Sequence, residues 1–136
     1  MASRLISHER LRPYATLLTA GWIVYWVILC GLTHWPKLPR MPIEISKEGL
    51  VAHFTAYSIL TAGCLISRIA RTGQTSAAWM GKWIAIFAGY AIVEEFTQAL
   101  TGRHPSALDF SADISAVVTV MLIARPWRRS AAPLGD

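Results

Sequence analysis

Hydrophobic residues fill four long stretches of the sequence, and charged residues gather near the ends of these stretches. Tyr14 to Leu32 and Gly49 to Ser67 contain no Asp, Glu, Lys or Arg. Ala77 to Leu100 has a lysine near its start and two glutamates near its end, and Ala107 to Ala124 has two aspartates in its first two turns. An α-helix rises about 1.5 Å per residue, so about 20 apolar residues cross the roughly 30 Å of hydrocarbon in a membrane. The pattern predicts an all-α polytopic membrane protein, a bundle of four transmembrane helices at about residues 14–33, 49–67, 77–100 and 107–124.

The chain is expected to form one transmembrane domain over residues 1–136. It is 54% hydrophobic and 15% charged, and no composition shift, repeat or Gly/Ser linker divides it. Its net charge of +5 comes from basic residues that flank the apolar stretches instead of forming one patch. This distribution argues against nucleic-acid binding and is typical of the cytoplasmic edges of membrane helices.

The first apolar stretch is interpreted as a retained membrane helix and not as a signal peptide, because no small-residue cleavage site follows it. More Lys and Arg residues fall on the side of the two chain ends than on the opposite side. This bias predicts that both termini are cytoplasmic.

This topology carries polar residues from three helices and one loop to the outer end of the bundle. Ionisable groups within apolar segments are costly, so they usually face the bundle interior and mark a functional site. The residues expected to meet there are His53, Tyr57, Glu95, Gln98, Arg103, Ser106, Asp109 and Asp113.

Spacing within each helix supports this convergence. His53 and Tyr57 are four residues apart and share a helix face, and the same holds for Asp109 and Asp113. Glu95 continues a stripe of small residues, Ala85, Ala88 and Ala91, of the kind that lets membrane helices approach closely. Glu95 is therefore expected inside the bundle. Its neighbour Glu94, about 100° away around the helix, is expected in solvent at the interface.

Each candidate has a chemical role and a structural alternative. His53, Glu95 and Asp109 are the catalytic candidates, because their side chains exchange protons. The Arg103 guanidinium suits a carboxylate or phosphate ligand, and its alternative is a salt bridge to Asp109 or Glu95 that ties the helix ends together. The remaining candidates for ligand binding are Tyr57, Gln98, Ser106 and Asp113.

Neither a metal nor a cofactor is predicted. The histidine and acids are plausible metal ligands, but no H-E-x-x-H or similar local spacing occurs, and Arg103 would oppose a cation. A Ser106–His53–Asp109 triad is conceivable from residue types, but Ser106 lacks the surroundings of a nucleophile elbow. The sequence also has no phosphate-binding loop and no dinucleotide-binding glycine motif.

The segments "HFTAY", "EEFTQ" and "GRHPSALDFSAD" resemble the signature blocks of the VanZ-like membrane proteins. The resemblance covers roughly residues 49 to 120 and implies a multi-pass protein of the bacterial inner (cytoplasmic) membrane. It matches the family pattern at His53, Tyr57, Glu95, Gln98, Gly102, Arg103, Ser106 and Asp109. The chain departs from that pattern at Asp113, where the family often has Asn, and at Gly49 and Leu50, where it often has Asp-Lys.

Three functions are consistent with these features. The first is binding, with or without catalysis, of an anionic amphiphile or a lipid-linked cell-envelope precursor at the outer leaflet. The second is that of a non-catalytic accessory subunit in a larger membrane complex. The third, implied by the family name, is a glycopeptide (teicoplanin) resistance factor. The expected partners are membrane lipids and other membrane-protein subunits, and not nucleic acid.

Overall fold

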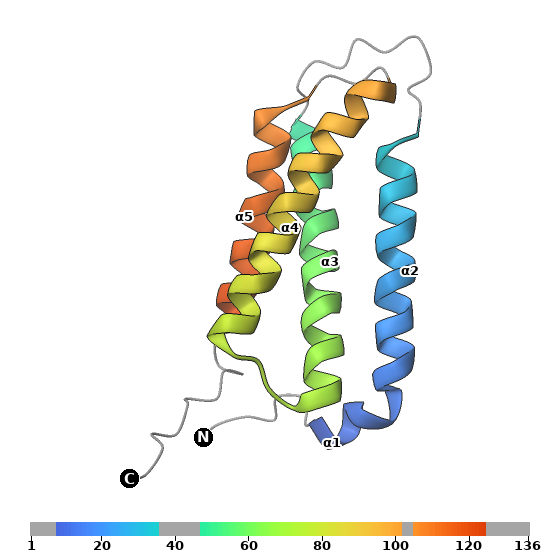
Figure 1. Ribbon diagram of the computed structural model, residues 1–136, viewed down its shortest axis with the longest axis vertical. Coiled ribbons are helices and arrows are strands. Elements are labelled where there is room, and N and C mark those ends of the chain that lie inside the picture. Colours follow the sequence, from blue (N-terminus) through green and yellow to red (C-terminus); the bar gives the residue numbers. More distant parts are fainter. Residues whose placement is uncertain (1–7, 36–46, 102–104, 125–136) are drawn as a thin grey trace.

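The computed structural model describes residues 8–35, 47–101 and 105–124, and in these ranges the protein is helical and has no β-strand (Figure 1). Four long helices alternate in direction, so that α2 and α4 run one way and α3 and α5 the other (Figure 1). The elements in chain order are α1 (His8–Leu11), η1 (Arg12–Tyr14), α2 (Ala15–Thr33), α3 (Lys47–Thr72), α4 (Ala77–Gln98), η2 (Ala99–Thr101) and α5 (Ala107–Ile123). The predicted all-α fold and the order of its four long helices are confirmed.

The helix predicted at residues 49–67 is longer than expected, because α3 continues to Thr72. Arg68 and Arg71, which follow the predicted range, therefore lie inside the helix. The Arg68 guanidinium lies over the Trp79 ring, 5.7 Å from its centroid, and Arg71 Nε donates to Thr19 Oγ1 at 3.0 Å. These contacts accommodate both charges at the end of the bundle, so the helix does not need to stop before them.

Two helical stretches of the described chain are long and apolar enough to cross a membrane, residues 8–33 and 49–72. The other two long helices are not in this group. Helix α4 carries Lys82, Glu94 and Glu95, and α5 has 17 residues and includes Asp109 and Asp113. The apolar character of the first two helices points to membrane association.

A short turn between α3 and α4 fixes the level at which the polar residues of α4 lie. Gly73 has a φ of 72°, a left-handed conformation that suits glycine at a helix end, and its N–H donates to the Ile69 carbonyl at 2.8 Å. Ser76 then caps α4, since its Oγ accepts from the Trp79 N–H at 3.1 Å. Because α4 starts beside the end of α3, its last turns reach the level of the first turns of α3.

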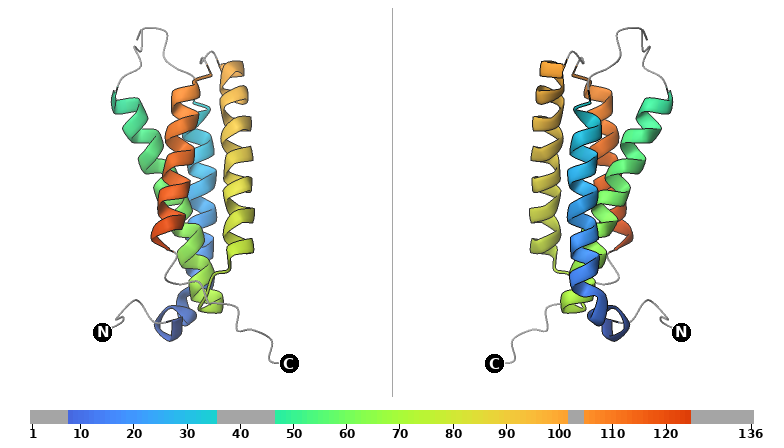
Figure 2. Two further views of the ribbon diagram at one scale, coloured as in Figure 1. Left: turned by 90° about the vertical axis from the view of Figure 1, so that its left-hand side faces the viewer. Right: turned by 90° about the vertical axis from the view of Figure 1, so that its right-hand side faces the viewer.

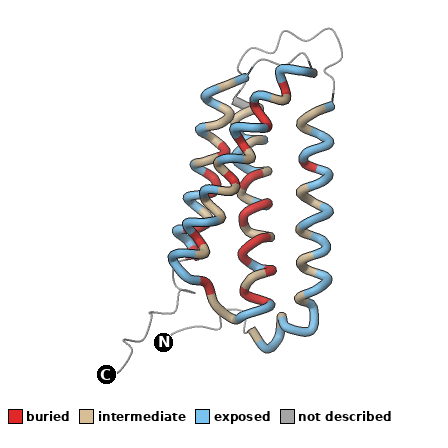
Figure 3. The backbone as a smooth tube through the Cα atoms, viewed as in Figure 1, coloured by how far each residue is buried: buried red, intermediate tan, exposed pale blue. Residues whose placement is uncertain are grey.

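Helix α3 packs against α5 and α2, and α4 packs chiefly against α5 (Figure 2). Buried residues concentrate on α3 and on the inward faces of α4 and α5 (Figure 3). The largest of them include Tyr57, Leu60, Phe87, Val117 and Met121. Their burial supplies most of the apolar core and holds the three helices that carry the polar residues.

Helix α2 is attached by aromatic side chains and leaves most of its apolar surface uncovered. Trp22 Nε1 donates to the Leu60 carbonyl at 3.0 Å, and Tyr25 Oη donates to the Ala56 carbonyl at 3.0 Å. The Trp22 ring also meets the Trp83 ring of α4 at a centroid distance of 5.4 Å. Among the described residues of α2, only Leu29 is buried. Its exposed apolar side chains form a surface of the kind that faces lipid or a partner.

Candidate functional site

His53 lies on α3 and faces two aspartates of α5 with its two ring nitrogens. The distance from His53 Nδ1 to Asp113 Oδ1 is 3.1 Å, and that from His53 Nε2 to Asp109 Oδ2 is 3.8 Å. Asp109 and Asp113 can reach one imidazole because residues four apart lie on the same helix face. The predicted meeting of these three residues is confirmed.

Glu95 links the end of α4 to the start of α5. Its side chain is 7% exposed, and its Oε2 accepts from the Ser106 N–H at 2.6 Å. Ser106 is also the N-cap of α5, because its Oγ accepts from the Asp109 N–H at 3.2 Å. A carboxylate at a helix N-terminus is stabilised by the free N–H groups and the helix dipole. The predicted burial of Glu95 is confirmed, and the structure gives Ser106 a capping role.

The prediction that Glu94 is solvated is wrong. Glu94 is 2% exposed, and its Oε2 accepts from the Tyr57 hydroxyl at 2.5 Å. Helix α4 has neighbours on two sides, so Glu94 faces α3 while Glu95 faces the start of α5. Adjacent residues about 100° apart can therefore both point into the bundle.

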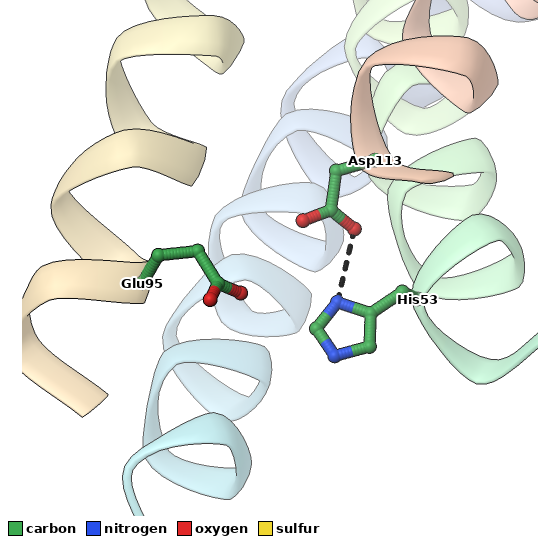
Figure 4. Close-up of side chains that lie close together, drawn as sticks. All are labelled: His53, Glu95 and Asp113. Atoms are coloured by element: carbon green, nitrogen blue, oxygen red, sulfur yellow. Dashed lines mark hydrogen bonds and ion pairs between the residues drawn. The ribbon is translucent and has the colours of Figure 1, made fainter. Parts of the chain in front are cut away.

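We call His53, Glu94, Glu95, Asp109 and Asp113 the polar cluster. One nitrogen of His53 and one carboxylate oxygen from each of Glu95 and Asp113 lie within 4.8 Å of one another. Figure 4 shows these three side chains pointing toward a common space from α3, α4 and α5. In the part of the chain that the structure describes, the ion pairs within salt-bridge distance all involve His53. The polar cluster therefore holds four carboxylates around one imidazole.

Two carboxylate oxygens in the polar cluster are left without a hydrogen-bond partner from the described residues. They are Glu94 Oε1 and Glu95 Oε1, and both are buried. An unpaired buried oxygen on an ionised carboxylate is costly, so such groups hold a proton, a cation or a ligand that donates to them. These two oxygens are therefore suited to hold a proton, a cation or a ligand that the described residues do not supply.

The other predicted site residues are distributed between this cluster, its edge and the rest of the chain. Tyr57 and Gln98 are buried beside the carboxylates on α3 and α4. Arg103 lies outside the described residues, and so does its expected contact with Glu95 or Asp109. Ser106 donates its N–H to Glu95 and uses its hydroxyl as a cap, while His53 turns both nitrogens to aspartates. The Ser106–His53–Asp109 triad is therefore not formed.

His34 is a member of this end of the bundle that the sequence analysis did not single out. Its Nε2 lies 2.6 Å from Thr97 Oγ1, and its Nδ1 lies 2.8 Å from the Cys30 carbonyl oxygen. The contact with Thr97 joins the end of α2 to the end of α4. The topology placed the end of the first helix at the same level as Glu95, and that signal could have found His34.

A groove of about 240 Å³ lies between α4 and α5 next to Glu95. We call it the α4–α5 groove, and its lining residues are Ile92, Glu95, Phe96, Pro105, Ser106, Ala107 and Phe110. Ile92 and Phe96 also expose much of their side chains on the outside of the bundle. Glu95 thus belongs both to the polar cluster and to the wall of an otherwise mostly apolar groove.

Comparison with family models, curated proteins and solved structures gives no match for this chain. The resemblance to the VanZ-like proteins consequently rests on the three sequence segments alone.

Proposed function

We propose that the chain is a multi-pass protein of the bacterial inner (cytoplasmic) membrane that binds an amphiphile at the outer leaflet. The polar head of the amphiphile contacts the polar cluster, and its apolar part lies in the α4–α5 groove. The observation that carries this proposal is the groove itself, because Glu95 and Ser106 line it together with Ile92, Phe96 and Phe110. A site with polar groups at one side and apolar walls matches the two ends of an amphiphile.

In this proposal all four long helices cross the bilayer and both termini are cytoplasmic. The 17 residues of α5 rise about 26 Å, close to the roughly 30 Å of a hydrocarbon core. Lys82 lies in the second turn of α4 and is exposed, so its amine can reach the interface along its aliphatic stem. The acids of α4 and α5 contact Tyr57, Ser106 and His53 in the bundle interior. Intramembrane acids are expected in such interior positions.

We expect the head to contain both a phosphate and hydroxyl groups. Carboxylates accept hydrogen bonds, so the polar cluster suits the hydroxyl donors of a glycerol or sugar unit. The phosphate would be held by Arg103, whose planar fork is matched to such anions. A glycerophospholipid or a lipid-linked sugar phosphate has this combination of groups.

Photo-crosslinking in vesicles tests the proposal. The protein would be reconstituted with diazirine-bearing phosphatidylglycerol, and the labelled residues would be mapped by mass spectrometry. We expect labelling to concentrate on the residues of the α4–α5 groove. A phosphatidylcholine probe with the same acyl chain, which lacks hydroxyl donors, should label the groove less.

A matched pair of variants provides the control. Ala107→Trp places a large side chain in the groove, whereas Ala85→Trp adds the same side chain at another exposed site, on α4. Groove labelling should be lost in Ala107→Trp and kept in Ala85→Trp. Even labelling of all apolar helix faces, unchanged by Ala107→Trp, would contradict the proposal.

The uncovered apolar face of α2 suits lipid as well as another membrane subunit. It therefore does not favour the accessory-subunit alternative over amphiphile binding.

A further inference from the structure

We infer that His53, Glu95 and Asp113 bind a divalent transition-metal ion, and that Asp109 orients the imidazole from outside the metal shell. The three ligands come from α3, α4 and α5, so no local sequence motif predicts the site. The expectation that no metal binds rested on the lack of such a motif and on Arg103, which the structure does not describe.

The geometry of the three side chains is close to that of a metal site. Ligand atoms about 2.0–2.2 Å from one zinc ion lie roughly 3.0–3.6 Å from each other. The 3.1 Å between His53 Nδ1 and Asp113 Oδ1 already falls in this range, and one ligand atom from each of the three residues lies within 4.8 Å of the other two. In Figure 4 the Glu95 carboxylate approaches the other two from the opposite side of the same space. Glu95 supplies the third ligand of the set.

The uncompensated oxygen of Glu95 is an independent reason to place a cation here. Glu95 Oε1 is buried and finds no hydrogen-bond partner among the described residues, while Oε2 is fixed by Ser106. The ionised carboxylates of Glu95 and Asp113, together with a neutral imidazole, balance the charge of a divalent ion. Such a neutral assembly is far less costly inside an apolar bundle than two free carboxylates.

The position of Asp109 fits an outer-shell role. A histidine that binds a metal through one nitrogen usually donates from the other to a carboxylate, which fixes the ring and raises its basicity. His53 turns Nδ1 to Asp113 and Nε2 toward Asp109 Oδ2, at 3.8 Å. With one nitrogen and two oxygens, this ligand set suits Zn²⁺ or Mn²⁺ better than Mg²⁺, which takes a shell of oxygen ligands. Three protein ligands leave room for a further ligand.

The metal site deepens the proposed function at one point only. If an amphiphile with a phosphate head binds as proposed, its phosphate can occupy the open position on the ion. The site itself does not depend on any amphiphile, so it is tested in detergent without added lipid.

The test is a titration of purified, chelator-treated protein with ZnCl₂ and, separately, MnCl₂ against a competing metal indicator. All variants would carry Cys30→Ala, because Cys30 Sγ lies 3.9 Å from His34 Nδ1 and could offer a second site. We expect one metal ion per chain. Asp109→Asn should weaken binding about 10–100-fold, as loss of an outer-shell partner does. Glu95→Gln and Asp113→Asn should weaken it more than that.

Glu9→Gln is the control, because it removes an exposed carboxylate far along the chain from the cluster. It should bind metal like the parent protein. Far-UV circular dichroism without metal should show the same helix content in all variants, since Gln and Asn keep the shape of the side chains. Absence of binding by either ion to folded parent protein, or equal binding by Glu95→Gln, Asp113→Asn and Glu9→Gln, would overturn the inference. Repeating the photo-crosslinking with a chelator separates the two proposals. Groove labelling that survives metal removal would show that amphiphile binding does not require the metal ion.

Discussion

The contact between α2 and α3 at Gly63 provides a sharp test of the packing. An added Cβ at Gly63 would lie 2.8 Å from Trp22 Cδ1 and 3.4 Å from Trp22 Cγ, whereas carbon atoms in contact are normally about 3.5–4.0 Å apart. The Trp22 side chain cannot easily move away from this contact. Its Nε1 donates to the Leu60 carbonyl, and its ring rests against Trp26 and Trp83.

We therefore expect Gly63→Ala to destabilise the protein by about 1–3 kcal/mol. Overpacking costs about 1–3 kcal/mol, and weakening the hydrogen bond to Leu60 adds about 0.5–1.5 kcal/mol. The higher helix propensity of alanine offsets about 0.5–1 kcal/mol of this. Gly89 is a matched helical control, because a Cβ there would meet no described atom within 4 Å. Gly89→Ala should be neutral or stabilising by up to about 1 kcal/mol.

The assay is reversible unfolding in mixed detergent micelles, followed by fluorescence of the six tryptophans that both variants keep. The two alanine variants should differ in free energy of unfolding by about 1–4 kcal/mol. If Gly63→Ala is as stable as Gly89→Ala, α2 does not approach α3 as closely as described. The attachment of α2 through Trp22 would then be incorrect.

Three further predictions concern the polar end of the bundle and its orientation. Tyr57→Phe removes the hydrogen-bond donor to Glu94, so the free energy of unfolding in the same assay should fall by about 1–3 kcal/mol. An unchanged value would mean that another group donates to Glu94. Ser106→Ala removes the cap of α5 but keeps the N–H bond to Glu95, so it should cost about 0.5–2 kcal/mol, whereas Ser106→Pro, which also removes that N–H, should cost more. In a variant that lacks Cys30 and Cys64, an impermeant thiol reagent added to intact cells should label Ala99→Cys but not Ala78→Cys. The reverse labelling would show that the predicted orientation is wrong.

Sequence patterns were sufficient for the helices and for most of the polar cluster. Apolar stretches bounded by Pro, Gly and charged residues located the four long helices within a few residues at most ends. Alternating direction put His53 and Glu95 at one level, and four-residue spacing put Asp109 and Asp113 on one face. These inferences need only helix geometry and connection length, which are local properties of the chain.

The errors arose where several helices determine the outcome together. Glu94 was placed in solvent because one inward direction was assumed for α4, while the packed helix has two. The second predicted helix ended at Ser67, before Arg68 and Arg71, because the contacts of these arginines with Trp79 and Thr19 form only in the packed bundle. The trio of His53, Glu95 and Asp113 and the α4–α5 groove depend on the lateral packing of α3, α4 and α5. No spacing within one segment encodes that packing.

Native mass spectrometry of purified protein tests the central claim that the polar cluster binds an amphiphile instead of only bracing the helices. The comparison is between Glu95→Gln, which keeps an acceptor for the Ser106 N–H but removes the charge, and the exposed control Glu9→Gln. The account predicts that the parent protein and Glu9→Gln retain a phosphate-containing lipid, and that Glu95→Gln loses it without loss of stability. Retention of the lipid by Glu95→Gln, together with a fall in the unfolding free energy of this variant, would contradict the account. Glu95 would then serve only to stabilise the contact between α4 and the start of α5.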